Sequence, residues 1–355
     1  MATGGAERHW ATLIRELAGR GAAVRLLTLD GRGPFFDDVV AQGLPAECLE
    51  LRRRLDPRGL RRALAVGSDF RPDAVVTRGV NGQLVGEAIA WRLRAVHVYN
   101  EHTPLTPGGR LVPPRPHQRV LTRVVARAVD DVVAVTERQV APLGALGYPR
   151  RRIEVVPNGV FARDVEGVER SPELDGKGFT VVCVAGLRPE KRVDLFIEAV
   201  AAARRENPAV RGYVAGEGRE RERLERLAGD NGVSLLGARR DVLSLVAGAG
   251  AVCLPSEAEA LPMSLIEAMA LACPVIATDV GGIRDLIVDG ETGHLVRPGD
   301  GAGITRALLA LAADEERARK MGAAGRRRQR ERFTGEAMVN GYERAFQEAV
   351  ARGRA

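Results

Sequence analysis

The chain has 355 residues, 45% of them hydrophobic and 28% charged, a balance typical of a globular protein with more than one domain. No apolar run approaches the roughly 20 residues that a membrane-spanning helix needs, and the first five residues lack the basic start and apolar stretch of a signal peptide. The net charge of +7 suits an anionic partner, but aromatic residues make up only 4% of the chain, so stacking on nucleic-acid bases is not expected.

Apolar strand-like runs alternate with helical patterns along the first half of the chain. Trp10, Leu13, Ile14 and Leu17 recur at helical spacing, which predicts a helix over 6–18 with one buried face. Strands are predicted at 23–29, 74–77, 95–99, 132–135 and 153–156. This alternation is typical of a parallel α/β sheet.

A polar segment at 166–178 has no apolar periodicity and predicts a linker between a first domain, 1–165, and a second, 179–335. The second domain repeats the alternation, with strands predicted at 179–184, 210–215, 233–236, 251–254 and 274–277. Helices are predicted at 193–205, 219–229, 241–248, 264–271 and 282–288. The last 50 or so residues also have a helical pattern.

The four cysteines are scattered along the chain and show no metal-ligand spacing: Cys48, Cys183, Cys253 and Cys273. Three of them lie in apolar strand-like or helix-edge settings. We therefore expect buried, reduced thiols, which suits a cytoplasmic protein.

The most informative segment is Glu259-Ala260-Leu261-Pro262-Met263-Ser264-Leu265-Ile266-Glu267. An apolar run leads into its loop, and Glu267 falls on the helix that follows. A helix N-terminus after a strand favours anions, while carboxylates accept strong hydrogen bonds from sugar hydroxyls. The combination predicts a sugar-nucleotide site, with an amphipathic helix carrying incidental acids as the alternative.

This segment resembles the Glu-x7-Glu motif of the retaining GT-B glycosyltransferases, a nucleotide-sugar-dependent family. The resemblance implies an α/β fold of two Rossmann-like, doubly wound parallel-sheet domains facing a cleft. It also implies that Glu267 binds the nucleotide ribose and that Glu259 lies beside the donor sugar. Three residues between the glutamates are expected to join the donor site: Leu261, Met263 and Ser264.

The turn at 185–192 resembles the family's Gly-Arg-Leu-x-x-x-Lys-Gly, in which the arginine and lysine neutralise the donor diphosphate. Lys191 fits the lysine position, whereas Gly186 stands where the arginine is expected. Arg188 and Arg192 are the candidates for the second cation. The alternative for Lys191 is a solvated side chain at a helix start, which the helix dipole disfavours.

Four other matches complete the resemblance. Gly216 fits a Gly-x-Gly turn, and Arg239 lies in the segment that resembles the loop framing the base. Gly4 and Gly5 match a glycine loop that approaches the donor phosphate when the domains close. His102 ends a strand-like run where the family often has a histidine that contacts the donor sugar, although a lone histidine is as often structural.

One departure concerns the start of the first domain. The family has an apolar strand of about six residues ahead of the glycine loop, and this strand is central in the sheet. The present sequence opens directly on that loop, which would leave neighbouring strands with unpaired backbone groups. We therefore expect the natural start to lie upstream of Met1. A C-terminal helix at 336–350 is expected to pack on the first domain.

The resemblance implies transfer of a hexosyl group from a UDP- or GDP-sugar to an acceptor hydroxyl, with retention of anomeric configuration, in bacterial polysaccharide or glycolipid biosynthesis. The acceptor could be lipid-linked, a glycan or a small molecule. No Asp-x-Asp occurs in the sequence, so no metal or other cofactor is expected. The alternatives are a nucleotide-sugar epimerase of the same fold and a degenerate, non-catalytic basic protein that binds the membrane surface.

An arginine-rich stretch with interleaved leucines predicts contact with an anionic membrane surface through Arg52, Arg53, Arg54, Arg58, Arg61 and Arg62. The alternative is a solvated charged face. The sequence thus favours a cytoplasmic protein, with docking at the inner face of the membrane as a further expectation.

Overall fold

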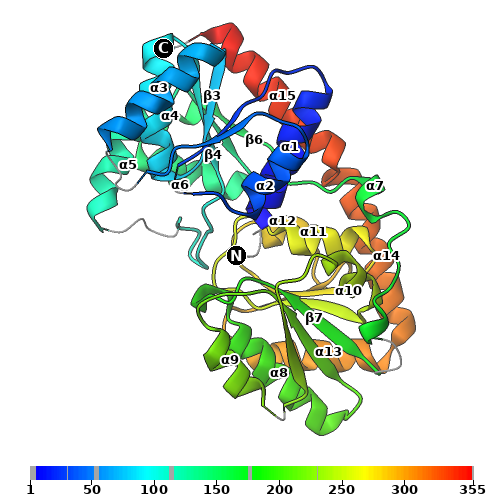
Figure 1. The fold of residues 1–355 in the computed structure, drawn as a ribbon. Helices are drawn as coiled ribbons and strands as arrows, with labels where there is room; N and C mark the ends of the chain where they lie inside the picture. Colours follow the sequence, from blue (N-terminus) through cyan, green and yellow to red (C-terminus); the bar gives the residue numbers. More distant parts are fainter. Residues whose placement is uncertain are drawn as a thin grey trace. The chain divides into compact units, whose positions relative to one another are not determined.

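A computed structural model describes residues 5–29, 31–51, 56–111, 116–174, 178–229 and 231–353. The chain forms two compact units (Figure 1). The N-terminal unit takes in residues 5–103, 110–157 and 338–353, and the C-terminal unit takes in residues 104–109 and 158–337.

Residues 158–165, which the sequence assigned to the first domain, pack with the C-terminal unit. The Asn158 amide donates to the Leu261 carbonyl at 2.6 Å, and the Val160 N–H to the Phe333 carbonyl at 3.0 Å.

The C-terminal unit is built on a six-stranded parallel sheet of order β12-β11-β10-β7-β8-β9. Its strands are β7 (Thr180–Val184), β8 (Arg211–Ala215), β9 (Val233–Gly237), β10 (Ala251–Leu254), β11 (Val275–Thr278) and β12 (His294–Val296). The chain runs outward from β7 to β9, then returns to β10 on the other side of β7. Every residue of β10 and β11 is buried, as expected for strands with helices on both faces.

Helices cover both faces of this sheet. One face carries α8 (Val193–Glu206), α9 (Arg221–Ala228) and α13 (Gly301–Ala313), and the other carries α10 (Val242–Gly248) and α11 (Met263–Ala270) (Figure 1). The remaining helices are α7 (Ala162–Val165), α12 (Ile283–Leu286) and α14 (Glu315–Arg332), with 3-10 turns η3 (Pro172–Leu174) and η4 (Pro189–Lys191). The five helices predicted here from the sequence correspond to α8 through α12. In α8 the buried residues Val193, Phe196, Ile197 and Val200 recur at helical spacing and face the sheet.

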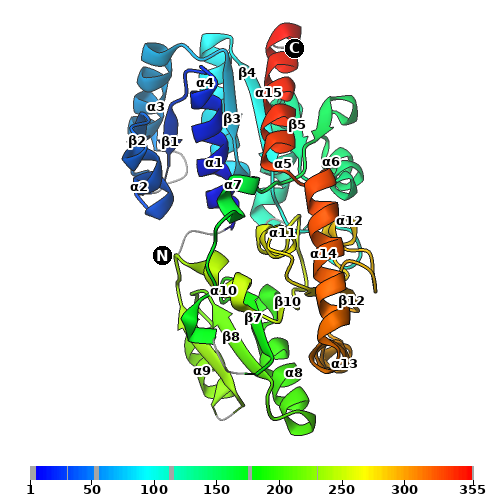
Figure 2. The same ribbon diagram turned by 90° about the vertical axis from the view of Figure 1, so that its right-hand side faces the viewer.

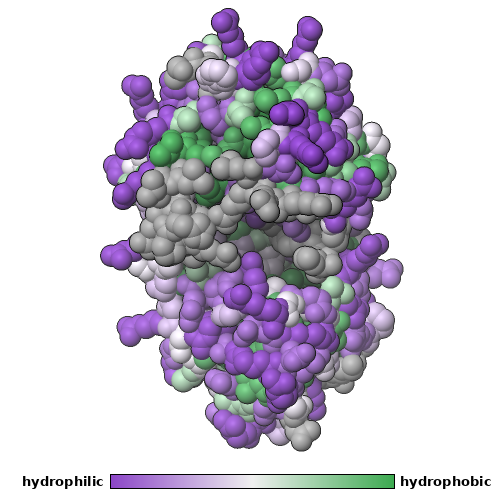
Figure 3. All heavy atoms as spheres, turned by 60° about the vertical axis from the view of Figure 1, so that its left-hand side comes forward, coloured by the Kyte–Doolittle hydropathy of each residue, from purple (hydrophilic) through white to green (hydrophobic). Residues whose placement is uncertain are grey.

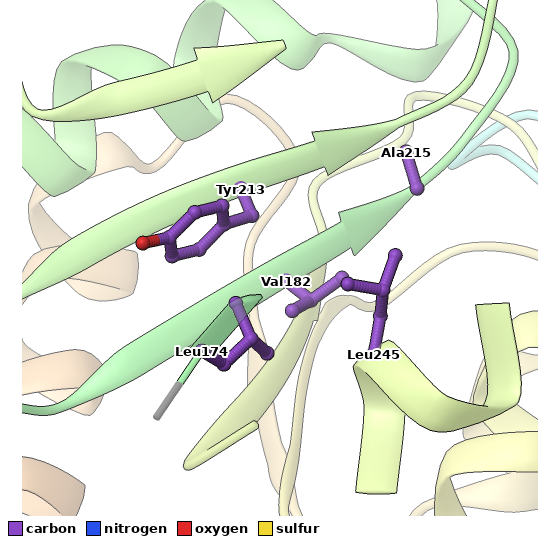
Figure 4. Packing of buried hydrophobic residues seen from close by; sticks show 5 residues of the cluster. All are labelled: Leu174, Val182, Tyr213, Ala215 and Leu245. Atoms are coloured by element: carbon purple, nitrogen blue, oxygen red, sulfur yellow. The ribbon is translucent and has the colours of Figure 1, made fainter. Parts of the chain in front are cut away.

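One cluster in this core shows how the layers hold together. Val182 on β7 packs with Tyr213 and Ala215 on β8, and Leu174 and Leu245 close over them (Figure 4). All five side chains are at most 6% exposed. The side chains come from η3, α10 and two adjacent strands, so the cluster fixes the α10 face against the centre of the sheet.

The N-terminal unit contains two parallel sheets. β1 (Leu26–Thr28) pairs with β2 (Ala46–Cys48), and a four-stranded sheet has the order β3-β4-β5-β6. Its strands are β3 (Ala74–Thr77), β4 (Val96–Glu101), β5 (Asp131–Ala134) and β6 (Ile153–Val155). Figure 2 shows β1 and β2 standing apart from β3, β4 and β5.

Helices also lie on both sides of these strands. α3 (Pro57–Phe70), α4 (Gly79–Leu93) and α5 (Pro116–Ala128) pack in sequence on one side (Figure 1). α1 (Gly5–Gly19) and α15 (Gly335–Arg352) pack on the other, where Tyr342 accepts a 2.7 Å hydrogen bond from Asn100 of β4. The unit also has α2 (Pro34–Ala41), α6 (Val140–Leu146), η1 (Glu137–Gln139) and η2 (Arg150–Arg152). Two parallel-sheet α/β units confirm the fold class predicted from the sequence.

Two further expectations concern the surface and the thiols. Within the described ranges, no helix combines the length and apolar character needed to cross a bilayer. On the face drawn in Figure 3, hydrophilic residues predominate and hydrophobic ones gather in smaller patches.

All four cysteines are buried and free, as predicted, and burial raises the pKa of the Cys183 and Cys273 thiols to about 12.

Candidate functional site

The centre of the C-terminal sheet is a topological switch point. β7 and β10 are neighbours, but the chain leaves β7 toward β8 on one side and leaves β10 toward β11 on the other. Connections that diverge in this way leave a crevice beyond the carboxyl ends of the two strands, where open parallel sheets bind ligands. Lys191 lies in the turn that follows β7, and Glu259 lies in the loop that follows β10.

Lys191 and Glu259 meet at this point. The Lys191 ammonium contacts Glu259 Oε1 at 2.5 Å, and the two side chains are only 14% and 6% exposed. Ser256 donates to the same carboxylate oxygen at 2.7 Å. The alternative of a solvated lysine is therefore wrong. A desolvated ammonium with three donors, one of them used here, is well suited to a second anionic partner.

The backbone of the Glu259 loop is held from three directions. Leu105 forms an antiparallel bridge with Glu259, with a 2.8 Å bond from the Leu105 N–H to the Glu259 carbonyl. Asn158 holds the Leu261 carbonyl, and the Gly282 N–H donates to the Ala260 carbonyl at 2.7 Å. The loop is thus a fixed support for the carboxylate rather than a free surface turn.

α11 begins directly after this loop. Pro262 occupies its cap position and supplies no side-chain hydrogen bond, and the first turn contains no acidic residue. The first N–H groups of α11, starting at Met263 and Ser264, are therefore not capped by a side chain and favour an anion. Glu267 lies one turn further along, with 6% of its surface exposed.

The arginines of the β7 turn are already engaged by acidic neighbours. Arg192 has a φ of +48° and pairs with Asp194 at 3.1 Å and with Glu257 at 2.7 Å, contacts that raise its pKa. Arg188 is more exposed, at 55%, and pairs with Glu190 at 3.1 Å. In the part of the chain that the structure describes, neither guanidinium is paired with Glu259, and Arg188 meets Lys191 only through its backbone carbonyl, which accepts from the Lys191 N–H at 2.9 Å.

Gly186 leaves room for a side chain. A Cβ built there would meet only Arg188 Nε and the Glu217 carbonyl, each at 3.8 Å, which is ordinary contact distance. We therefore expect Gly186→Arg to fold normally and to add a cation beside the β7 turn. Charge-assisted hydrogen bonds contribute about 1.5–3 kcal/mol, so nucleoside diphosphate binding should tighten about tenfold.

The matched control for this substitution is Gly186→Gln, which adds a polar side chain without charge. Titration calorimetry of both variants with a nucleoside diphosphate separates the effect of the added charge from the effect of the added side-chain volume. Equal affinities for the two variants would contradict the expectation.

Two further predicted residues follow the neighbouring strands. Gly216 follows β8 and has a φ of +158°. A Cβ at this position would lie 1.9 Å from the Ala185 carbonyl oxygen. Because the turn after β8 approaches the turn after β7 this closely, position 216 requires glycine. Arg239 follows β9 and forms a two-pronged ion pair with Asp241, with a third contact to Glu173 at 2.9 Å; these bonds raise its pKa. Lys191, Glu259 and Gly216 therefore share the carboxyl edge of the sheet with Arg239.

The remaining predicted residues belong to the N-terminal unit. Gly5 begins α1, and Gly4 lies outside the described residues. His102 follows β4 and lies edge-on to His9, with ring centroids 4.8 Å apart. Burial and the nearby His9 and Arg78 hold the pKa of His102 well below its usual value, and burial lowers that of His9 to about 3.

These two imidazoles should make stability depend on pH. Both stay neutral in the folded unit, whereas the unfolded chain takes up protons as the pH falls through about 6.5. Unfolding therefore binds protons, and stability should fall as the pH drops below 6.5, by up to about 2 kcal/mol at pH 5 for His9, with His102 acting in the same direction. Urea unfolding at pH 7.5 and pH 5 measures this loss, which His9→Phe should reduce. If His9→Phe loses as much stability between pH 7.5 and pH 5 as the unaltered chain does, the pH dependence does not arise from His9 and His102.

Sequence reasoning missed several residues of this edge. Ser256 is fully buried and bonds Glu259, and Asn158 fixes the loop carbonyl. The signal for Ser256 is its position just after a buried strand, whereas no local pattern could have paired Leu105 with Glu259. Within the described ranges, no three His, Cys, Asp or Glu side chains cluster in a way that could hold a metal ion.

Two family models together match nearly the whole chain. The family described as Glycosyltransferase Family 4 matches residues 3–162, and the one described as Glycosyl transferases group 1 matches residues 165–328. The second match contains the switch point with Lys191, Glu259 and Glu267.

Individual relatives agree with these matches. An exopolysaccharide phosphotransferase of Streptomyces coelicolor is 33% identical over 73% of this chain, which is 27% of that protein. A GDP-mannose-dependent phosphatidylinositol monomannoside mannosyltransferase of Mycolicibacterium smegmatis is 32% identical over 59% of this chain and 60% of its own length. The chain thus spans between about a quarter and three fifths of these relatives.

A solved structure shows the shared fold. HepE of Anabaena, crystallised with UDP and glucose, superposes with a TM-score of 0.81 at 20% identity, covering 97% of this chain and 96% of its own. The chain therefore belongs to the GT-B glycosyltransferases, in the family-4-like group described as glycosyl transferases group 1.

Proposed function

We propose that the protein transfers a hexosyl group from a nucleoside diphosphate sugar to an acceptor hydroxyl. The observation that carries this proposal is the buried Lys191–Glu259 pair at the switch point, next to the uncapped start of α11. A cation and helix N–H groups suit a diphosphate, while a carboxylate suits sugar hydroxyls. HepE was crystallised with UDP and a relative depends on GDP-mannose, which supports a UDP- or GDP-sugar.

The proposed chemistry depends on stabilising the leaving group. As the bond from the anomeric carbon to the diphosphate oxygen breaks, negative charge grows on the diphosphate. Lys191 and the first N–H groups of α11 would stabilise that charge in a site that excludes most water. Glu259 would hold the sugar and Glu267 the ribose. The departing diphosphate would take the proton of the acceptor hydroxyl on the face from which it leaves, which retains the anomeric configuration.

We propose that the reaction needs no metal. The support is the absence of an Asp-x-Asp in the sequence and the presence of Lys191, whose positive charge can neutralise the diphosphate. Transfer should continue in excess EDTA. Activity that EDTA abolishes and magnesium restores would contradict this part of the proposal.

The nucleotide product tests the proposal directly. Glycosyl transfer breaks the bond between sugar and diphosphate and releases a nucleoside diphosphate. Transfer of a sugar phosphate would instead break the diphosphate and release a nucleoside monophosphate; this alternative is tested because the Streptomyces relative is named an exopolysaccharide phosphotransferase. Chromatography of reactions with UDP- and GDP-sugars should show UDP or GDP, and release of only UMP or GMP would overturn the proposal.

The fate of the sugar provides the second arm of this test. Proton NMR of the product should show the anomeric configuration of the donor. An inverted product would contradict retention, and an epimerised free sugar without transfer would favour an epimerase of the same fold.

We propose a cytoplasmic protein that docks at an anionic membrane surface, which would suit a lipid-linked acceptor. Arg58 and Arg61 lie exposed on α3, as does Arg62, which pairs with Glu47 at 2.7 Å. Arg52, Arg53 and Arg54 lie outside the described residues. Replacing Arg58 and Arg61 with Ala should weaken sedimentation with anionic liposomes, and undiminished sedimentation would contradict the role of this stretch.

A further inference from the structure

A cavity of about 660 Å³ lies inside the N-terminal unit, at the amino ends of β3 and β4. Its walls come from the last turns of α3 and α4, from the connections 71–73 and 94–95 that follow them, and from the end of α15 (Figure 1). His102 follows the carboxyl end of β4, so the cavity lies at the opposite edge of this sheet. Cavities of roughly 300–1,000 Å³ have the size that proteins use to bind small molecules.

The lining of this cavity is basic. It contains three arginines and one acid, a net charge of +2: Arg71, Arg92, Arg94 and Asp73. All three arginine residues are exposed, and within the described ranges no hydrogen bond or ion pair engages their guanidinium groups. Each guanidinium has five N–H donors in a planar fork, so the cavity offers free donors to an anion.

The acids on neighbouring elements have other partners. Asp69 of α3 pairs with Arg25 at 2.9 Å, and Asp131 at the start of β5 pairs with Arg352 at 2.6 Å. Neither acid therefore neutralises the lining, and Asp73 alone cannot balance three cations. The protein leaves this positive charge uncompensated.

The alternative is that the arginines only cap the helices, whose C-termini favour positive charge. The backbone already does this capping. The Arg71 N–H donates to the Gly67 carbonyl at 2.7 Å, and the N–H groups of Arg94 and Ala95 both donate to the Ala90 carbonyl. Among the described residues, none of the three guanidinium groups bonds to a helix carbonyl, so capping does not explain why these positions carry arginine.

Two of the arginines are held in strained backbone conformations. Arg71 has a φ of +51° and Arg94 a φ of +59°, the left-handed conformation in which helices usually place glycine. They are two of five non-glycine residues with positive φ in the described chain, and a third is Arg192 in the turn of the candidate donor site. Such strain concentrates at functional sites, where it fixes the direction of a side chain.

The frame of the cavity is closely packed and partly apolar. α3 and α4 approach each other at Gly67, where a Cβ would lie 2.9 Å from Ile89 and 3.1 Å from Leu93. This contact holds the two helix ends, and with them the arginines, close together. Leu93 and the 40% exposed Val350 also line the cavity, so its occupant has an uncharged part beside the anionic group.

We propose that this cavity binds an organic phosphate. The phosphate oxygens accept hydrogen bonds from Arg71, Arg92 and Arg94, because the guanidinium fork matches phosphate geometry, and the organic part packs against Leu93 and Val350. A soluble phosphate ester and the headgroup of a phospholipid share this chemistry. The inference does not rest on the proposed function, because all of its residues lie outside the Lys191–Glu259 site.

The test replaces Arg71 and Arg94 together by Asn, which removes two charges and tolerates the left-handed conformation. The matched control replaces Arg123 and Arg151 by Gln. These two are exposed arginines of the same unit outside the cavity, so the control removes the same net charge. Circular dichroism shows that both variants are folded, and binding of nucleoside diphosphate should be unchanged in both.

Two probes distinguish the sources of the phosphate. Calorimetry with glycerol 3-phosphate measures a soluble ester, and sedimentation with phosphatidylcholine vesicles that contain phosphatidic acid measures a headgroup. The Asn variant should bind at least about tenfold more weakly than the unaltered chain, and the control about equally. A loss seen with glycerol 3-phosphate supports a soluble ester, whereas a loss confined to the vesicles supports a headgroup.

The variant that combines Lys191→Met with Glu259→Gln separates this cavity from the switch point. It should bind glycerol 3-phosphate as the unaltered chain does. The inference is overturned if that variant loses the binding, because the anion would then occupy the switch point. It is also overturned if neither probe binds the unaltered chain, or if the Asn variant and its control bind both probes equally.

Discussion

Lys191→Met is expected to abolish most transfer activity and to destabilise the C-terminal unit. The substitution keeps an unbranched side chain that is one atom shorter, but it leaves the Glu259 side chain, which is 6% exposed, without its cation. Removing one partner of a buried ion pair costs about 3–5 kcal/mol. Loss of one charge-stabilising group at a leaving group typically lowers the rate constant about 10²–10³-fold.

A double variant separates these two effects. Lys191→Met combined with Glu259→Gln removes the unpaired charge, so urea unfolding should show most of the lost stability restored. Transfer should remain low in the double variant, because the diphosphate still lacks its cation. Transfer by folded Lys191→Met at the unaltered rate would show that the lysine only pairs with Glu259.

Gly281→Ala is expected to displace the loop that supports Glu259. Gly281 has a φ of +51°, and a Cβ there would lie 1.8 Å from the Glu259 carbonyl oxygen and 3.4 Å from Leu105 Cβ. The loop would have to move, which breaks the bridge to Leu105. We expect a loss of about 3 kcal/mol or more in the free energy of unfolding, together with weaker nucleotide binding.

Gly290→Ala is the matched control in the same unit. Its φ is +76°, but a Cβ there would meet nothing within 4 Å, so the variant has backbone strain without a clash. Left-handed conformation alone costs about 1–2 kcal/mol, and nucleotide binding should be unchanged. Equal losses in the two variants, measured by urea unfolding, would mean that the contact with Glu259 contributes nothing.

The sequence predicted the C-terminal unit closely because its strands are continuous apolar runs and its helices have clear periodicity. The N-terminal unit was harder. β2 is three residues long with Glu47 at its centre, so it shows no apolar run. α4 is apolar on much of its surface, as in Val85 and Ile89, and α5 has basic residues between its apolar positions; neither gives a clean stripe.

The components of the candidate site could be found from the sequence, but their arrangement could not. Lys191 and Glu259 are 68 residues apart and meet only because β10 returns beside β7. Strand order is a tertiary property that local patterns do not encode. The sequence led us to expect Glu259 beside a sugar, whereas in the structure Lys191 and Ser256 already occupy one of its oxygens. A sugar at the proposed site would therefore bind the other carboxylate oxygen or share these contacts.

Titration calorimetry with UDP, GDP and ADP tests the central claim, that the switch point of the C-terminal unit binds a nucleoside diphosphate. The unaltered chain, Glu267→Ala and Lys191→Met are compared, with circular dichroism to show that each variant is folded. The site described here predicts micromolar binding of one nucleotide by the unaltered chain and at least about tenfold weaker binding in both variants. Absence of binding by all three nucleotides, or equal binding by all three proteins, would contradict it.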